Sequence, residues 1–230
     1  MSGRAAFITF EGLEGVGKTT NRDHAARRLA EAGIDAITTR EPGGTDVGEQ
    51  LRELMLHQEV SLRPETEMLL MAAARVEHLA QVIEPALAAG RWVLCDRYLD
   101  ASVAYQGAGR ELGVERVLDL HRLAGVTRRP DLTLLLDMPV AAGRQRAGAR
   151  SAPDKIERED DGFFARARKA YLDAAAAEPE RVVVIDASRS LTEVQASINE
   201  ALAALYDRLG THDHALPGPG NGASTVPGQR

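Results

Sequence analysis

One stretch decides the fold of this chain: Gly12-Leu13-Glu14-Gly15-Val16-Gly17-Lys18-Thr19. It fits the pattern G-x-x-x-x-G-K-[ST], in which backbone N–H groups surround nucleotide phosphates, the lysine reaches the β- and γ-phosphates, and the threonine holds Mg²⁺. The apolar run 5–10 before it is typical of a strand, and residues 21–32 after it carry Ala and Leu at helical spacing. The alternative is a strand-to-helix turn without a ligand. The pattern in this context favours a phosphate site at the helix N-terminus.

The composition is that of an ordinary globular domain. Of the 230 residues, 27% are charged and 44% are hydrophobic. The net charge of -6 argues against a general binder of nucleic acids or of anionic membranes. No apolar run approaches the length of a membrane span and no export segment is recognisable at the N-terminus, so we expect a cytoplasmic protein. The single cysteine, Cys95, lies in an apolar run and is expected to be a buried thiol.

Apolar runs and helical patterns alternate along the chain. This alternation predicts an α/β fold with a five-stranded parallel sheet, helices on both faces, and ligands at the carboxyl ends of the strands. Pro85 is expected to kink its helix or to end it early. The segment 211–230 is rich in Gly and Pro, so we expect a disordered tail there. Strands are expected at 5–10, 35–39, 91–95, 132–136 and 182–185, and helices at 21–32, 47–56, 65–89, 140–148, 162–177 and 191–209.

Seven stretches of the chain resemble the thymidylate kinase family, whose members phosphorylate dTMP to dTDP. They fall in the family's order, and the resemblance covers roughly residues 5–209. It implies a three-layer P-loop kinase fold on a domain of residues 1–210, a helical lid at about 144–158, ATP as donor, Mg²⁺ as cofactor, and a role in dTTP synthesis. It also implies a homodimer, with the apolar helix 65–89 as the expected interface. The matching stretches are 10–20, 40–45, 72–75, 96–98, 104–107, 129–133 and 154–157.

Phosphoryl transfer between two phosphates requires positioning and cationic charge more than a general base, because the acceptor phosphate is already ionised. Arg97 is suited to a bidentate grip on that acceptor phosphate. Asp96 either orients a Mg²⁺-bound water or pairs with Arg97, and a structural ion pair is the alternative for both. Thr19 and Asp96 are the expected Mg²⁺ residues. The expected ATP-binding residues are Gly12, Leu13, Glu14, Gly15, Val16, Gly17, Lys18, Thr19 and Thr20, of which Lys18 is also expected to be catalytic.

The segment from Arg144 to Arg158 contains five basic residues, and Pro153 interrupts its helical pattern. A solvated helix face is one interpretation, and a basic lid that folds over ATP is the other. The resemblance favours the lid. Arg150 or Lys155 is then expected to stabilise the charge being transferred. The choice between the two stays open, because Lys155 stands where many relatives have arginine.

The acceptor site follows from the resemblance. Glu14 is expected to meet the 3′-hydroxyl, Tyr105 to exclude a 2′-hydroxyl, and Arg75 to donate to a thymine carbonyl. Met71 stands where the family has an aromatic residue stacked on the base, and its thioether can pack on a ring face. The full expected dTMP set is Glu14, Arg40, Pro42, Met71, Arg75, Arg97, Tyr105 and Gln106.

Two other functions are compatible with parts of the pattern. A kinase for another nucleoside monophosphate shares the phosphate loop, and a deoxynucleoside kinase would in addition need Glu11 or Asp96 as a base. A nucleotide-switched binding protein of the GTPase type is the second alternative, but no N-K-x-D element is found. The acceptor and lid stretches favour dTMP as substrate.

Overall fold

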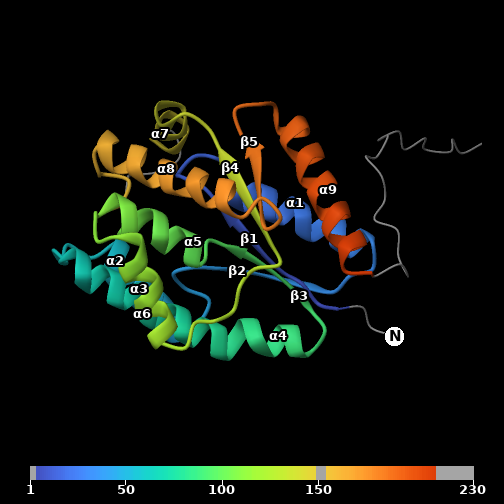
Figure 1. Ribbon diagram of the computed structural model, residues 1–230, viewed down its shortest axis with the longest axis horizontal. Coiled ribbons are helices and arrows are strands. Elements are labelled where there is room, and N and C mark those ends of the chain that lie inside the picture. Colours follow the sequence, from blue (N-terminus) through green and yellow to red (C-terminus); the bar gives the residue numbers. More distant parts are fainter. Residues whose placement is uncertain (1–3, 149–153, 211–230) are drawn as a thin grey trace, which may run out of the picture.

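The structure, a computed structural model, describes residues 4–148 and 154–210. The predicted tail at 211–230 and the lid residue Arg150 lie outside the described residues. A parallel sheet forms the middle layer and helices cover both of its faces (Figure 1). The predicted α/β fold is therefore confirmed.

Five parallel strands form the sheet in the order β2-β3-β1-β4-β5. They are β1 (Phe7–Glu11), β2 (Ala36–Arg40), β3 (Trp92–Asp96), β4 (Leu132–Asp137) and β5 (Val182–Asp186), within one or two residues of the predicted strands. Phe10 pairs with Asp96, and Asp96 also pairs with Arg40 on its other side. This register brings three loops together at one edge of the sheet: those that follow β1, β2 and β3.

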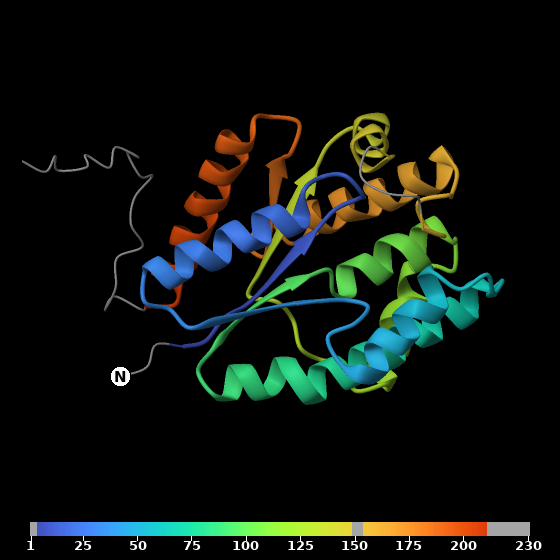
Figure 2. The same cartoon turned by 180° about the vertical axis from the view of Figure 1, so that it is seen from behind.

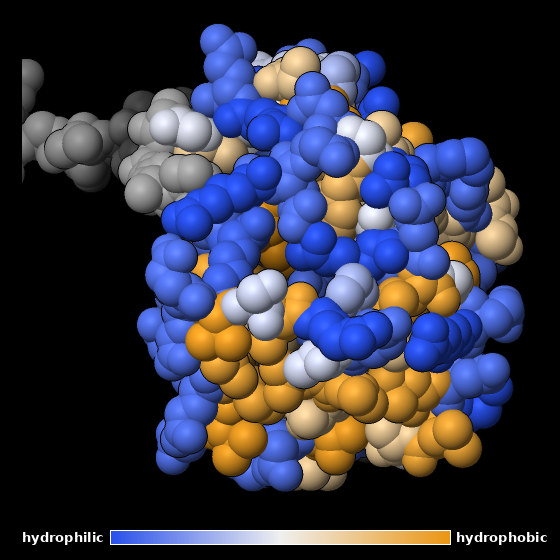
Figure 3. Space-filling view, turned by 90° about the vertical axis from the view of Figure 1, so that its left-hand side faces the viewer, coloured by the Kyte–Doolittle hydropathy of each residue, from blue (hydrophilic) through white to orange (hydrophobic). Residues whose placement is uncertain are grey.

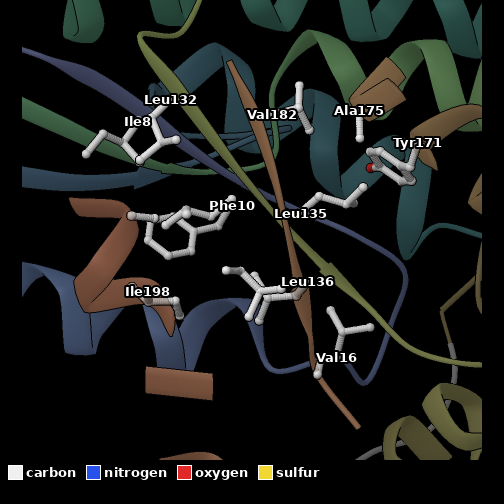
Figure 4. Close-up of a cluster of buried hydrophobic side chains, with 14 of the residues drawn as sticks. Ile8, Phe10, Val16, Leu132, Leu135, Leu136, Tyr171, Ala175, Val182 and Ile198 are labelled. Atoms are coloured by element: carbon white, nitrogen blue, oxygen red, sulfur yellow. The ribbon is translucent and has the colours of Figure 1, made fainter. Parts of the chain in front are cut away.

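Two helices cover one face of the sheet, α1 (Lys18–Glu31) and α9 (Leu191–Arg208), and they contact each other (Figure 2). The other face carries α4 (Glu84–Ala88), against β3, and α8 (Asp161–Ala177), against β4 and β5. Side chains alternate accordingly: Phe10 and Leu136 lie near Ile198 of α9, whereas Leu135 lies toward Tyr171 and Ala175 of α8 (Figure 4). The inner strands β1, β3 and β4 are buried on both faces, which explains why their apolar runs are nearly unbroken.

The predicted helix 65–89 is one helical segment with three parts. It consists of α3 (Pro64–His78), a π-helical turn η1 (Leu79–Ile83) and α4. Pro85 lies in the first turn of α4, directly after the π-helical turn. The wider turn before the proline lets the helical segment continue to Ala88, so Pro85 does not end it early.

Three elements between β3 and β4 were not predicted: α5 (Leu99–Ser102), a π-helical turn η2 (Val103–Gly109) and α6 (Val114–Leu123). Gly107 and Gly109 lower the intrinsic helix propensity of this segment. Tertiary packing stabilises it instead, because α8 packs on η2 and leaves no room for a side chain at Gly109, where a Cβ would lie 2.6 Å from the ring of Phe163.

The remaining helices are α2 (Asp46–Leu56) and α7 (Val140–Gly148). The hydroxyl of Thr45 accepts the backbone N–H of Gly48 and so caps α2. The cap fixes where the loop after β2 ends. The same loop begins with the cis peptide bond Glu41-Pro42.

Candidate active site

A cleft of about 830 Å³ opens at the carboxyl edge of the sheet. The loops after β1, β2 and β3 contribute to its wall, together with α2, α3, η2 and the described part of the predicted lid. Its residues include most of the predicted site: Glu14, Gly15, Lys18, Thr19, Arg40, Pro42, Met71, Asp96, Arg97, Tyr105, Gln106 and Lys155.

The loop between β1 and α1 requires glycine at two positions. A Cβ on Gly12 would lie 2.2 Å from the carbonyl oxygen of Leu136, and one on Gly15 would lie 2.0 Å from that of Gly143 in α7. Both glycines also have positive φ, 126° and 75°. The loop is therefore pressed against β4 and α7, with its remaining side exposed to the cleft. Leu13 and Val16 belong to the apolar core, so only their backbone can serve a ligand, and Thr20 does not line the cleft.

Lys18 is folded back onto this loop. Its ammonium donates to the carbonyl oxygens of Gly12, at 3.1 Å, and Leu13, at 2.7 Å. Burial, followed by the charge of Arg97, lowers the pKa of Lys18 to about 8. A polyanion in the loop would replace these carbonyl contacts and favour the charged ammonium.

Thr19 and Asp96, the two expected Mg²⁺ residues, lie together in the structure. The Thr19 hydroxyl donates to Asp96 Oδ2 at 2.9 Å, and both residues line the cleft. Within residues 4–148 and 154–210, no group of three or more His, Cys, Asp or Glu side chains could hold a metal ion. A hydroxyl and one carboxylate suit Mg²⁺, because this ion usually takes few protein ligands and completes its octahedral shell with phosphate oxygens and water.

Arg97 pairs with Glu14, whereas Asp96 is bonded to Thr19. Nη2 of Arg97 donates to Glu14 Oε1 at 2.5 Å, and Nη1 of Arg97 donates to Gly12 O at 2.9 Å. The guanidinium also lies 5.0 Å from the ring centre of Tyr105, whose hydroxyl donates to both Glu14 carboxylate oxygens at 3.0 Å. The predicted alternative of an Asp96–Arg97 ion pair is therefore not the pairing that the structure has, since Arg97 pairs with Glu14. Glu14, Arg97 and Tyr105, from three separate segments, form one hydrogen-bonded group.

Besides Arg97 and Arg40, a third arginine, Arg52, lines the cleft, and the sequence analysis did not predict it. Arg52 of α2 lines the cleft, and its Nη1 donates to Pro42 O at 3.0 Å. Arg40 lines the same wall, held by Glu49 at 2.8 Å. Arg52 follows Glu49 by one helical turn, and that spacing on the predicted helix 47–56 was the available signal. Burial, and then the charge of Arg40, lowers the pKa of Arg52.

Arg75 lies behind the wall of the cleft rather than in it. Its side chain is fully buried, and four of its five N–H groups are taken by protein acceptors. These acceptors are Glu41, Ser102, His121 and the carbonyl of Tyr98. The structure therefore does not bring Arg75 together with the other predicted dTMP residues, and a contact with a thymine carbonyl would have to use the one remaining N–H.

Gln106 and Met71 do lie in the wall. Gln106 Nε2 donates to Glu67 Oε1 at 2.8 Å, which fixes the orientation of the amide. Its Oε1 is buried and has no hydrogen-bond partner among the described residues. Met71 is part of a small apolar cluster with Met55 and Leu56 at the same side of the cleft.

The described part of the predicted lid contacts the wall formed by α2 and the segment after it. Lys155 donates from its ammonium to Val60 O at 2.5 Å and from its backbone to Leu56 O at 3.4 Å. Ile156 packs on the cluster of Met55, Leu56 and Met71. Lys155 therefore lies in the cleft as predicted, whereas Arg144 turns to Asp161.

Comparisons with known proteins agree with one another. The family model described as thymidylate kinase matches residues 10–198. A thymidylate kinase of Methylococcus capsulatus is 56% identical over 192 residues, covering 84% of this chain and 92% of that protein. A thymidylate kinase of Bordetella petrii is 49% identical over 207 residues, covering 90% of this chain and 99% of that protein. The crystal structure of thymidylate kinase from Ehrlichia chaffeensis matches with a TM-score of 0.72 and 32% identity, covering 86% of this chain and 98% of that one.

Proposed function

Because the chain belongs to the thymidylate kinase family and phosphorylates dTMP to dTDP at the expense of ATP, we propose that the cleft is where the two nucleotides meet. One observation carries this proposal. The carboxylate of Glu14, the guanidinium of Arg97 and the hydroxyl of Tyr105 converge beside the phosphate loop, so that sugar-binding and phosphate-binding groups lie side by side.

The donor phosphates are assigned to the loop 12–19. Backbone N–H groups of the loop and of the first turn of α1 are available to them, and Lys18 exchanges its two carbonyl contacts for phosphate oxygens. Thr19 and Asp96 would hold Mg²⁺, which supplies charge neutralisation for the phosphates when bound.

The acceptor phosphate is assigned to Arg97, with Arg40 and Arg52 on the facing wall. An ionised phosphate is its own nucleophile, so these residues need only bind and orient it. Of the two residues that could serve as the base of a deoxynucleoside kinase, Glu11 is fully buried and does not line the cleft, whereas Asp96 does line it and accepts the hydroxyl of Thr19. Burial therefore excludes Glu11 as that base and leaves Asp96, which this proposal assigns to Mg²⁺.

The nucleoside of dTMP is assigned to Tyr105, Glu14, Gln106 and Met71. Glu14 accepts from the 3′-hydroxyl, and the ring of Tyr105 occupies the space that a 2′-hydroxyl would need. The partner-free Oε1 of Gln106 is suited to accept the N3–H of thymine. Met71 offers a polarizable surface to the face of the base.

Incubation with Mg·ATP and a panel of monophosphates tests this assignment. We expect dTMP to be the best substrate, dUMP to be weaker by about 1–3 kcal/mol in kcat/KM, as for one methyl group, and UMP and CMP to be near background. Tyr105→Phe should keep the discrimination against UMP, because the ring and not the hydroxyl excludes the 2′-oxygen. Equal turnover of UMP and dTMP would contradict the assignment of Tyr105.

We also propose that the protein forms a homodimer through an exposed apolar face. Figure 3 shows hydrophobic residues gathered in the lower half of one face, on the side where Figure 1 places α2, α3 and α6. The exposed large hydrophobic residues of these helices are Val47, Leu69, Val114 and Leu123. A second copy of the chain is the proposed occupant of this face, giving a homodimer. We also propose a cytoplasmic location, as expected for an enzyme of nucleotide synthesis. Among the described residues, no helix is long and apolar enough to cross a membrane.

A further inference from the structure

Glu11, the last residue of β1, is a buried acid that the proposed reaction does not use. Its side chain is fully buried, and it lies directly before the phosphate loop. Oε1 accepts the backbone N–H of Tyr98 at 2.7 Å, and Oε2 accepts the hydroxyl of Tyr171 at 2.8 Å. Both carboxylate oxygens are thus engaged by groups from other segments.

The bond to Tyr98 matters because of the residue before it. Arg97 has φ of 70°, one of two described non-glycine residues with positive φ. This left-handed backbone is unfavourable for an arginine and persists only where surrounding contacts fix it. Arg97 N–H donates to Phe10 O at 3.0 Å, the thiol of Cys95 donates to Arg97 O at 3.0 Å, and the next N–H goes to Glu11.

The backbone carbonyls of the residues on either side of Glu11 already accept other donors. The carbonyl of Phe10 already accepts Arg97 N–H, and that of Gly12 accepts both Arg97 Nη1 and Lys18 Nζ. The Glu11 side chain thereby satisfies the N–H at the point where the chain turns away from the sheet. Without it, a buried N–H would be left unpaired next to a strained residue.

We propose that Glu11 is a positioning residue that acts through Arg97. By holding the Arg97-Tyr98 peptide, it keeps the left-handed turn that presents the guanidinium to the acceptor phosphate. This inference rests on the proposed function, in which Arg97 binds that phosphate. Glu11 itself touches neither nucleotide, because it does not line the cleft.

The surroundings of Glu11 allow the role in either protonation state. The groups that act on it are Asp100 of α5, Tyr171 of α8, Lys18 of α1, and Cys95 and Arg97 around the end of β3. Burial, and then the charge of Asp100, raises the pKa of Glu11 to about 7. Both the carboxylate and the neutral acid keep an oxygen that can accept the N–H of Tyr98, and so does a glutamine.

Three variants test the inference in the full chain. Glu11→Met keeps the volume but removes the acceptor, and we expect a loss in kcat/KM for dTMP of roughly tenfold to a hundredfold, as for a misplaced catalytic contact. The Kd of ATP should change less than about threefold, because the donor loop is untouched. Glu11→Gln should rescue kcat/KM for dTMP. Tyr171→Phe is the matched control: it also leaves a buried oxygen without its partner, but it spares Tyr98 N–H, and it should keep kcat/KM within about threefold.

A double-mutant cycle separates this role from general destabilisation. If Glu11 acts only through Arg97, Glu11→Met should add little to the loss caused by Arg97→Ala. Multiplicative losses, or equal activity losses in Glu11→Met and Tyr171→Phe, would overturn the inference. If Glu11→Met does not fold, Glu11→Asp, whose carboxylate is withdrawn by one methylene, takes its place with the same expected losses. An unchanged KM of dTMP in Arg97→Ala would contradict the assignment of Arg97 to the acceptor phosphate. This result is distinct from those that contradict the role of Glu11.

Discussion

Lys18 and Arg97 both donate to the carbonyl of Gly12, yet they are assigned to different nucleotides. Lys18→Ala should lower kcat by orders of magnitude, since the lysine serves the phosphates being transferred. Arg97→Ala should mainly raise the KM of dTMP and leave the Kd of ATP for the free enzyme nearly unchanged. Steady-state kinetics and calorimetry with a non-hydrolysable ATP analogue measure the two effects. Loss of ATP binding in Arg97→Ala would place this residue on the donor.

The buried acid Glu11 gives stability a defined pH dependence. Its pKa is about 7 in the folded chain, against 4.5 for an exposed glutamate. Between these values the folded state binds a proton that the unfolded state lacks, so the free energy of unfolding should fall as pH rises from about 4.5 to about 7, by about 3 kcal/mol. Urea unfolding of the wild type and of Glu11→Gln across this range measures the difference. A constant difference between the two curves would contradict the raised pKa.

Side chains at the site divide into those that a sequence pattern can place and those that it cannot. The phosphate loop fixes the positions of Lys18 and Thr19 locally, because glycine spacing and helix start determine them together. Arg75 was predicted at the base from the family resemblance, but its burial depends on Glu41, Ser102 and His121, which come from separate segments. Contacts of that kind arise from tertiary packing, which no local pattern contains.

At the scale of elements, the strands were predictable and the π-helical turns were not. Strands buried on both faces leave an unbroken apolar run, whereas η2 has two glycines and depends on α8 for its shape. The same segment carries Tyr105 and Gln106. The least predictable element of the fold therefore supplies part of the candidate site.

This dependence can be tested at Gly109. In Gly109→Ala the new methyl group would lie 2.6 Å from the ring of Phe163, so we expect a loss of about 1–3 kcal/mol in the free energy of unfolding and a lower kcat/KM for dTMP. Gly148→Ala at the end of α7 serves as the control, because nothing lies within 4 Å of its new methyl group. Thermal unfolding measures the change in stability of each variant, and initial rates with dTMP measure the change in kcat/KM. Equal behaviour of the two variants would show that η2 can shift without cost.

At the scale of the whole molecule, the exposed apolar face over α2, α3 and α6 predicts self-association. Leu69→Glu introduces a charge at a residue of α3 that is 53% exposed, and it should convert a dimer to a monomer without unfolding it. Leu191→Glu is the matched control, because Leu191 has the same exposure but lies on α9. Light scattering coupled to size exclusion gives the mass of each. A monomeric wild type, or a dimer in Leu69→Glu, would contradict the proposed interface.

Lys155 and Ile156 connect the lid to the wall assigned to dTMP, and this connection has a thermodynamic consequence. Binding of dTMP on the acceptor side should restrict the motion of Leu56 and Val60. Because Lys155 is hydrogen-bonded to both, its motion is restricted as well, and ATP then binds to a lid segment that is already ordered. Reciprocity requires dTMP to strengthen binding of an ATP analogue by the same factor as the analogue strengthens binding of dTMP. Calorimetry in both orders gives that factor, and in Ile156→Ala it should fall toward one. The two substrates would then be cooperative ligands of a single chain, with the short lid segment as the carrier of their coupling.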